Sequence, residues 1–476
     1  MHSRYIRYSN LQAAIALAML TACSASQQET PATPQPVLFS STVGSLADTR
    51  AGQTGPMTTD KLKDYDIYTG GGGFGVFAYY TANQTWASAA ATTYPNFMYN
   101  QQVYWDDYST QNWVYEPLKF WPNENQPADD QGATGAQWPH SYLSFFAYAP
   151  YVDHTASLGT SGIINFSSNE TKGAPTVTYA LSDTPAEQVD LLWGTRGTAT
   201  YQEADGTPNT DAATVNTDLT KQTTTERVDF LFRHALASLD IYVQRVYDEF
   251  TPTGKKPDND DHTKIFVSQL QLTIPAGQFY HSGKLDLATG TWTGVSNNAS
   301  PYTLTITSDD IAPNLQGTPL SNDNLTAVQN VELNPFGTKT GADETLRRLT
   351  ERTYATMLLP CDGNTGITLT PTLSYNFVTQ DPSLQLNMPN ADGSSRYARI
   401  QHTVEGDPLT IGTEYDDGGV KKYRLKAGYR YIIYCYIGVE SVRFQVVGIE
   451  DWDFPLRYTT SLPGFNNGQI EKSVKE

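Results

Sequence analysis

The sequence is short of charge, of cysteine and of long apolar runs. Charged residues make up only 17 % of the 476 residues, and 31 lysines and arginines stand against 50 aspartates and glutamates, a formal net charge of -19. A surface of this sign repels nucleic acid and anionic membranes, so both are excluded as partners. No long amphipathic helix pattern is present. The length nevertheless allows two or more cores of ordinary size.

Motifs that carry catalysis are missing as well. The seven histidines include no HExxH and no i, i+4 pair, which argues against a metal site. The glycine run Gly70–Gly73 lacks a following GK[ST], and no GxSxG elbow occurs. Adjacent carboxylates such as Asp106 and Asp107 point to opposite faces of a strand, unlike a glycosidase pair. We therefore expect no catalytic residue, no metal, no cofactor and no enzyme activity, and we interpret His234 as structural.

What the chain does contain favours β structure. Aromatic residues reach 12 %, with 30 tyrosines, 36 glycines and 27 prolines, a composition typical of a secreted all-β protein with many turns. Short alternating segments recur along the whole length. Because an antiparallel sheet must bury one face, the economical prediction is two β-sandwiches in series.

Three segments make this prediction specific. Tyr142–Tyr151 is continuously apolar and ends at a proline, which predicts a central strand. Val228–Val246 predicts two strands joined around His234, with one short helix as the alternative. Lys284–Thr293 predicts a hairpin with its turn at Thr289–Gly290.

The N-terminus has the form of a lipoprotein signal. Basic residues precede the apolar run Leu11–Leu20, which is too short to span a bilayer, and Leu20–Cys23 resembles a bacterial lipobox. Residues 1–22 are thus predicted to be removed and Cys23 to be acylated, which would anchor the protein in the outer membrane. The alternative is a plain signal peptide with a chance cysteine. Ser24–Pro36 has no hydrophobic periodicity and is predicted to be a disordered tether.

The next stretch, Val37–Arg50, is the one on which the functional prediction rests. Val37, Phe39, Ser41 and Val43 alternate on one side, as in a half-buried strand. A polar turn and the single pair Arg50–Ala51 follow. Our interpretation is that this strand closes the first core and can be cut off after Arg50. The alternative is an ordinary first strand beside a surface arginine.

The domain prediction follows from these segments. Residues 23–50 would form the tether and removable strand, residues 51–224 an N-terminal sandwich, and residues 225–476 a C-terminal sandwich. The boundary falls at the end of the linker-like stretch Tyr201–Glu226, which has no apolar stripe. Beyond Cys23, only Cys361 and Cys435 remain. An oxidising compartment permits a disulfide between them, and two buried free thiols are the other possibility.

Several stretches together resemble the fimbrillin-like family, the subunits of type V pili, and they keep the family's order along the chain. They are Leu20–Cys23, Thr49–Ala51, Phe74–Tyr79, Phe145–Tyr151, Asp190–Trp193, Phe230–Leu236, Leu358–Pro360 and Gly428–Tyr431. The resemblance implies two transthyretin-like β-sandwich domains and lipoprotein export. It also implies cleavage by an Arg-specific protease, after which a strand from the next subunit fills the groove left by the first strand.

A candidate donor strand lies in the C-terminal segment 453–476. Phe454, Leu456, Tyr458, Thr460 and Leu462 alternate with the same period as the removable strand. The segment could instead be the last edge strand of the second domain. Stalk, tip and anchor positions in the pilus therefore all stay open.

The predicted function is that of a structural subunit of a bacterial surface pilus, or fimbrium. Its partners would be other pilus subunits, an Arg-specific protease, the outer membrane through the lipid on Cys23, and an unidentified surface receptor. The alternative is a surface-anchored glycan-binding lipoprotein, because the tryptophans and tyrosines could form a platform on which sugars stack.

Overall fold

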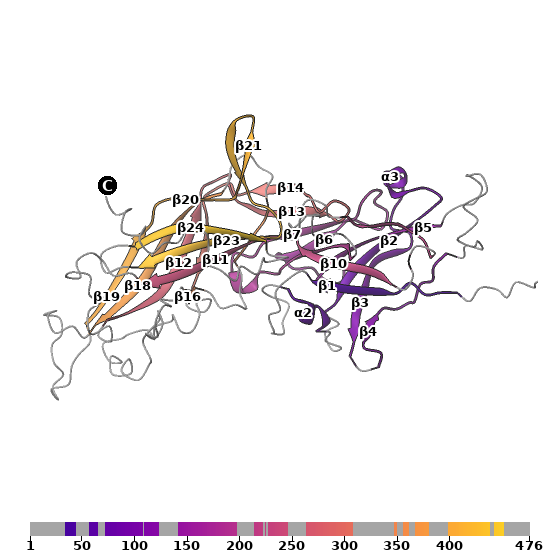
Figure 1. The fold of residues 1–476 in the computed structure, drawn as a ribbon, viewed down its shortest axis with the longest axis horizontal. Coiled ribbons are helices and arrows are strands. Elements are labelled where there is room, and N and C mark those ends of the chain that lie inside the picture. The colour runs from indigo at the N-terminus through magenta and orange to yellow at the C-terminus, as the bar shows by residue number, and fades with distance from the viewer. Residues whose placement is uncertain are drawn as a thin grey trace, which may run out of the picture.

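The structure, a computed structural model, is almost entirely β and elongated (Figure 1). It describes residues 34–43, 57–64, 72–107, 109–122, 141–197, 214–221, 224, 227–245, 263–307, 347–349, 356–360, 367–379, 398–437 and 442–451. The helices described are single short turns: α2 (Thr59–Lys63), α3 (Trp86–Ala89) and the 3-10 turn η2 (Pro185–Glu187). The predicted all-β class is confirmed.

An eight-stranded sheet organises the N-terminal end of the molecule. In spatial order it contains β1 (Phe39–Val43), β10 (Val228–His234), β8 (Leu192–Arg196), β5 (Tyr142–Ala149), β2 (Phe74–Ala82), β3 (Met98–Asp106) and β4 (Asn112–Val114), with β9 (Asn216–Leu219) beside β5. The predicted central strand at Tyr142–Tyr151 is therefore confirmed as β5. The first and last strands of the sheet, β1 and β4, contact each other, which shows that the sheet is curled.

Both faces of this sheet are buried. Phe77, Tyr79, Phe146 and Tyr148 belong to a core cluster that they share with the next sheet, whereas Phe74 and its alternate neighbours face a second cluster. Two buried faces explain why β2 and β5 read as unbroken apolar runs instead of alternating.

A four-stranded sheet covers the first of these faces. Its strands are β14 (Trp292–Asn297), β13 (Tyr280–Asp286), β7 (Thr176–Ala180) and β6 (Gly162–Phe166). The hairpin predicted at Lys284–Thr293 is confirmed: β13 pairs with β14, and Gly290 adopts a positive φ of 69° in the turn. A side chain at Gly290 would also meet the Trp193 ring.

Two five-stranded sheets build the other end of the molecule. One contains β16 (Arg347–Arg348), β11 (Ala237–Arg245), β23 (Tyr429–Ile437), β24 (Val442–Asp451) and β17 (Thr356–Leu358). The other contains β15 (Tyr302–Ile306), β12 (Thr263–Ile274), β18 (Ile367–Thr379), β19 (Ala398–Glu405) and β20 (Leu409–Ile411), and a separate hairpin joins β21 (Thr413–Asp417) to β22 (Val420–Arg424).

The topology corrects the boundary expected at residue 225. The segment Val228–Val246 forms two strands, as the first alternative predicts, but β10 joins the N-terminal sheet and β11 the C-terminal one. The hairpin β13–β14 also returns to pair with β7. The chain crosses between the two ends more than once because the apolar face of each strand is buried only in the sheet that accepts it.

Cys435 lies in the middle of the C-terminal end, on β23, and is a buried free thiol. Cys361 lies outside the described residues. Burial in apolar surroundings raises the pKa of the Cys435 thiol well above its ordinary value, so the reactive thiolate is scarce.

We therefore expect native Cys435 to resist iodoacetamide at pH 8 and to react only after unfolding in guanidinium. Peptide mass mapping would check this outcome. A Thr42→Cys variant is a matched positive control, because Thr42 is exposed on its strand. Rapid labelling of Cys435 in the folded chain would contradict its burial.

Candidate functional site

The candidate site is the first strand together with the surfaces that hold it. Val37, Phe39 and Val43 are all buried in the second core cluster, while Thr42 on the other side of the strand is exposed. The alternation predicted for this stretch is thus confirmed. Its pairing is parallel to β10, with Phe39 opposite Val228 and Val43 opposite Phe232.

Phe39 is the centre of this packing. Its ring centroid lies 5.3 Å from that of Tyr115, 5.8 Å from that of Phe145 and 6.0 Å from that of Phe230. A fourth ring, Phe74, stands edge-on at 6.4 Å. Aromatic pairs of this geometry contribute about 0.5–1.5 kcal/mol each beyond their buried area. One side chain of β1 therefore contacts β2, β5, β10 and the segment after β4.

Backbone hydrogen bonds hold the start of the strand from both sides. On one side, the Val228 amide donates to the Leu38 carbonyl at 2.8 Å. On the other, the Val37 amide donates to the Lys119 carbonyl at 2.9 Å, and the adjoining bridge pairs Pro36 with Phe120. The stretch from Pro36 to Val43 thus begins between two neighbours and continues along β10 alone.

Tyr115 reinforces the same end of the strand. Its buried hydroxyl donates to the Val37 carbonyl at 2.8 Å. Burial raises the pKa of Tyr115 to about 12, and the hydrogen bond from the Lys119 amide opposes this shift. The phenol is consequently neutral, and able to donate, at any physiological pH.

Arg227 spans the opening between the two ends of the sheet. One Nη donates to the Phe39 carbonyl at 3.1 Å, and the other Nη donates to Oδ1 of Asn112 on β4, also at 3.1 Å. A guanidinium can make both bonds at once because its donors form a planar fork. This residue therefore links β1 and β4, which are the first and last strands of the sheet.

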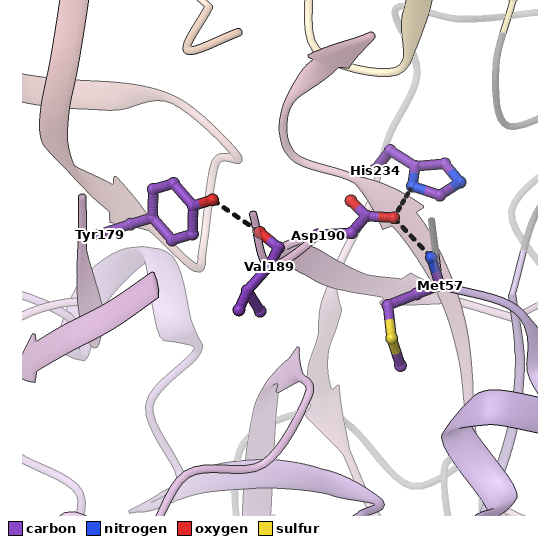
Figure 2. Close-up of polar contacts among 5 residues, drawn as sticks. All are labelled: Met57, Tyr179, Val189, Asp190 and His234. Carbon is purple, nitrogen blue, oxygen red and sulfur yellow. Dashed lines mark hydrogen bonds and ion pairs between the residues drawn. The ribbon is translucent and has the colours of Figure 1, made fainter. Parts of the chain in front are cut away.

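The chain after β1 is anchored separately. The Val43 amide donates to Oγ1 of Thr59 at 3.1 Å, so the two ends of the stretch 44–58 lie close together. The amide of Met57 donates to Oδ2 of Asp190 at 2.8 Å, and the same oxygen lies 2.7 Å from Nδ1 of His234 (Figure 2). Both side chains are fully buried, which supports the structural role predicted for His234.

Figure 2 also shows why Asp190 is held in place. The hydroxyl of Tyr179 on β7 donates to the carbonyl of Val189 at 2.6 Å, just before the aspartate. Asp190 therefore joins the segment at Met57 to the end of β10 and, through its neighbour, to the covering sheet.

Other predicted site residues lie outside the described residues. They are Cys23, Arg50, Ala51, Phe454, Leu456, Tyr458 and Leu462. Among the residues that the structure does describe, no group of histidine, cysteine and carboxylate side chains could hold a metal ion. Within the same part of the chain, no helix is long and apolar enough to cross a membrane.

Sequence reasoning missed Tyr115, Arg227 and Asp190. Arg227 offered a faint signal, since it is a lone cation between a linker-like stretch and a strongly apolar strand. Tyr115 offered none, because its partner Val37 is distant in sequence. Asp190 begins the stretch Asp190–Trp193 that resembles the family, but its contacts with Met57 and His234 could not be predicted from that resemblance.

Comparison with known proteins defines the class first. No protein-family model matches the chain. The crystal structure of a fimbrial protein from Bacteroides vulgatus has the same fold, with a TM-score of 0.54 and 22 % identity over 88 % of this chain and 99 % of that one. The fold is thus that of a fimbrial protein.

A particular relative then emerges from the sequence. The fimbrium subunit Fim1C of Phocaeicola vulgatus is 28 % identical over 317 residues, which cover 65 % of this chain and 68 % of the relative. The two similarities support the fimbrillin-like family that the sequence motifs resemble.

We expect Phe39→Ala to lower the free energy of unfolding by about 3–5 kcal/mol, because it empties a buried aromatic pocket. Chemical denaturation followed by tryptophan fluorescence would measure the loss. Thr42→Ala is the matched control on the exposed side of the same strand and should change stability little. Equal effects of the two substitutions would contradict the central place of Phe39.

We expect Arg227→Ala to loosen β1 selectively. Losing two charge-assisted hydrogen bonds at a half-exposed site should speed amide exchange within Phe39–Val43 by about tenfold. Hydrogen exchange with mass spectrometry would measure it. Arg227→Lys keeps the charge without the fork and should give an intermediate rate. Unchanged exchange in β1 would show that Arg227 does not retain the strand.

Proposed function

We propose that the protein is a structural subunit of a bacterial surface pilus and assembles by exchanging its first strand for one from a neighbouring subunit. The similarity to a fimbrium subunit supports the pilus role and a cell-surface location, and a structural relative argues against an enzyme. Assembly with other pilus subunits follows from that role.

The proposed sequence of events begins with export. Acylation of Cys23 would hold the precursor at the outer membrane, since several acyl chains give durable anchoring. An Arg-specific protease would then cut between Arg50 and Ala51. The cut would leave β1 held only by non-covalent contacts, while the chain from Met57 onward keeps its own anchor on Asp190.

The observation that carries this proposal is the position of β1. It fills the core of the curled sheet, yet the sequence joins it to the rest of the domain only through the stretch that contains Arg50. The contact between Val43 and Thr59 holds both ends of that stretch together before the cut. After the cut, that contact no longer has covalent support.

A second observation supports exchange over permanent retention. Among the described residues, the buried Oγ atoms of Ser40 and Ser41 have no hydrogen-bond partner. Each buried unsatisfied polar group costs about 1–3 kcal/mol. An incoming strand that satisfies or lacks these two polar groups would therefore bind the groove more tightly than β1 does.

We propose the segment containing Phe454, Leu456, Tyr458 and Leu462 as the incoming strand of the neighbour. With Thr460 included, its alternation of large and small side chains matches that of Val37, Phe39, Ser41 and Val43, so the large side chains would enter the pockets of the groove and Thr460 would take the place of Ser41. Backbone hydrogen bonds to β10 would supply affinity, and the aromatic pocket of Phe39 would supply specificity.

The test is treatment of the full chain with an Arg-specific protease. We expect loss of the residues up to Arg50 by mass spectrometry, followed by oligomers that resist mild denaturant. Arg50→Ala should stay uncut and monomeric. Arg50→Lys is the matched control, since it keeps the charge but removes the cleavage site and should also stay monomeric.

Fibres formed by Arg50→Ala would sink the proposed mechanism. A chain that ends at residue 452 separates the donor from the acceptor role. It should be cut normally, accept a strand from the intact protein and fail to polymerise alone. If it polymerises as well as the full chain, the segment 453–476 is not the donor.

A further inference from the structure

A groove lies where the two ends of the curled sheet approach each other. Its volume is about 700 Å³, and its walls include Leu38 beside β1, Tyr104 and Trp105 on β3, Asp107, Glu116 and Leu118. A volume of this size is in the range of small-molecule sites, which are usually a few hundred to about 1,000 Å³.

Aromatic side chains form much of the lining. Trp105 is half-buried and stands edge-on to Trp113, with 5.5 Å between ring centroids. Trp113 in turn packs on Phe74 in the core, at 5.1 Å. The Trp105 ring is thus held by edge-on aromatic contacts that lead into the core, and the Nζ of Lys63 lies over it, 4.2 Å from the ring centroid. A ring held in this way can contact a ligand without losing conformational freedom on binding.

Three carboxylates line the groove, and one of them, Asp106, already accepts hydrogen bonds from Ser109 and Thr110. Asp107 and Glu116 are exposed, line the groove, and have no hydrogen bond or ion pair through their side chains in the part of the chain that the structure describes. They are therefore free to accept hydrogen bonds from a ligand. Ionised carboxylates act as acceptors only, so the matching ligand groups are donors such as hydroxyls.

The charge of the lining restricts the ligand further. The described lining holds no lysine, arginine or histidine, but the Nζ of Lys63 lies beside it, 4.2 Å from the centroid of the Trp105 ring. An anionic ligand, such as a phosphorylated or sulfated sugar, would meet three carboxylates, which outnumber this one lysine.

We propose that this groove is a binding site for a neutral oligosaccharide. The apolar face of a sugar ring would stack on Trp105 in place of the Lys63 ammonium, which is held there only by a cation–π contact of about 0.5–1 kcal/mol. Its hydroxyls would donate to Asp107 and Glu116, and Leu38 and Leu118 would close the ends of the site. A neutral sugar adds apolar contact to the ring and hydroxyls for the carboxylates, whereas an incoming lysine would only replace the Lys63 ammonium on the ring with another one.

The experiment uses the uncut full chain, so it does not depend on strand exchange, and its failure would leave the pilus proposal intact. Neutral gluco-, galacto-, manno- and xylo-oligosaccharides would be titrated by calorimetry and by tryptophan fluorescence. We expect saturable binding of at least one of them. Trp105→Ala should weaken that binding by about tenfold or more.

A second variant guards against a folding defect in Trp105→Ala. The double substitution Asp107→Asn and Glu116→Gln changes only exposed side chains and should weaken binding by about tenfold. Glu170→Gln, an exposed carboxylate between β6 and β7, is the matched control and should bind like the wild type. The thermal midpoint of each variant would confirm that it is folded.

Three results would overturn the proposal. They are the absence of saturable binding across the whole set of sugars, binding that survives both the Trp105 and the carboxylate substitutions, and saturable binding of a lysine-rich peptide with every sugar inert. The last result would assign the groove to a basic protein partner.

Discussion

The packing of aromatic rings around Phe39 is the interaction on which the N-terminal end depends. The sheet curls so far that its first and last strands meet, and the space inside is filled from all sides by rings. Phe39 contacts four of these rings, from β2, β5, β10 and the segment after β4. Without the Phe39 side chain, the curled sheet would enclose a cavity, because the surrounding side chains are too closely packed to move into the space.

The strand that carries Phe39 is, by contrast, held by modest means. It is short, it pairs along one side for most of its length, and two of its buried hydroxyls find no partner among the described residues. A strand with strong side-chain packing but unsatisfied polar groups is stable where it lies, yet a better-matched strand could displace it. This combination suits a strand that is to be replaced, and it would be a defect in one that is to stay.

Local features were predictable from the sequence and long-range ones were not. The buried face of Val37–Val43, the central strand at Tyr142 and the hairpin at Gly290 follow from alternation, apolar runs and turn residues. The partners of these elements do not, because register between strands depends on contacts far apart in sequence. Arg227 reaches Phe39 across 188 positions, and β13 pairs with a strand of the other half.

The same limit applies to domain boundaries. A polar stretch before Val228 favours a division there, but an apolar strand joins whichever sheet buries it, and β10 is buried by the N-terminal one. The buried strand β1 was therefore predictable from the sequence and its removal stays a prediction, while the side chains that hold β1 became visible only in three dimensions.

One consequence concerns mechanical load. The hairpin β13–β14 comes from the second half of the chain, and its strand β13 pairs through five residues with β7, a strand of the first half. The main apolar cluster also continues without a break from Phe77 at one end to Phe444 at the other. Under tension along its long axis, such a subunit would resist extension as one rigid body, unlike two domains joined by a flexible linker.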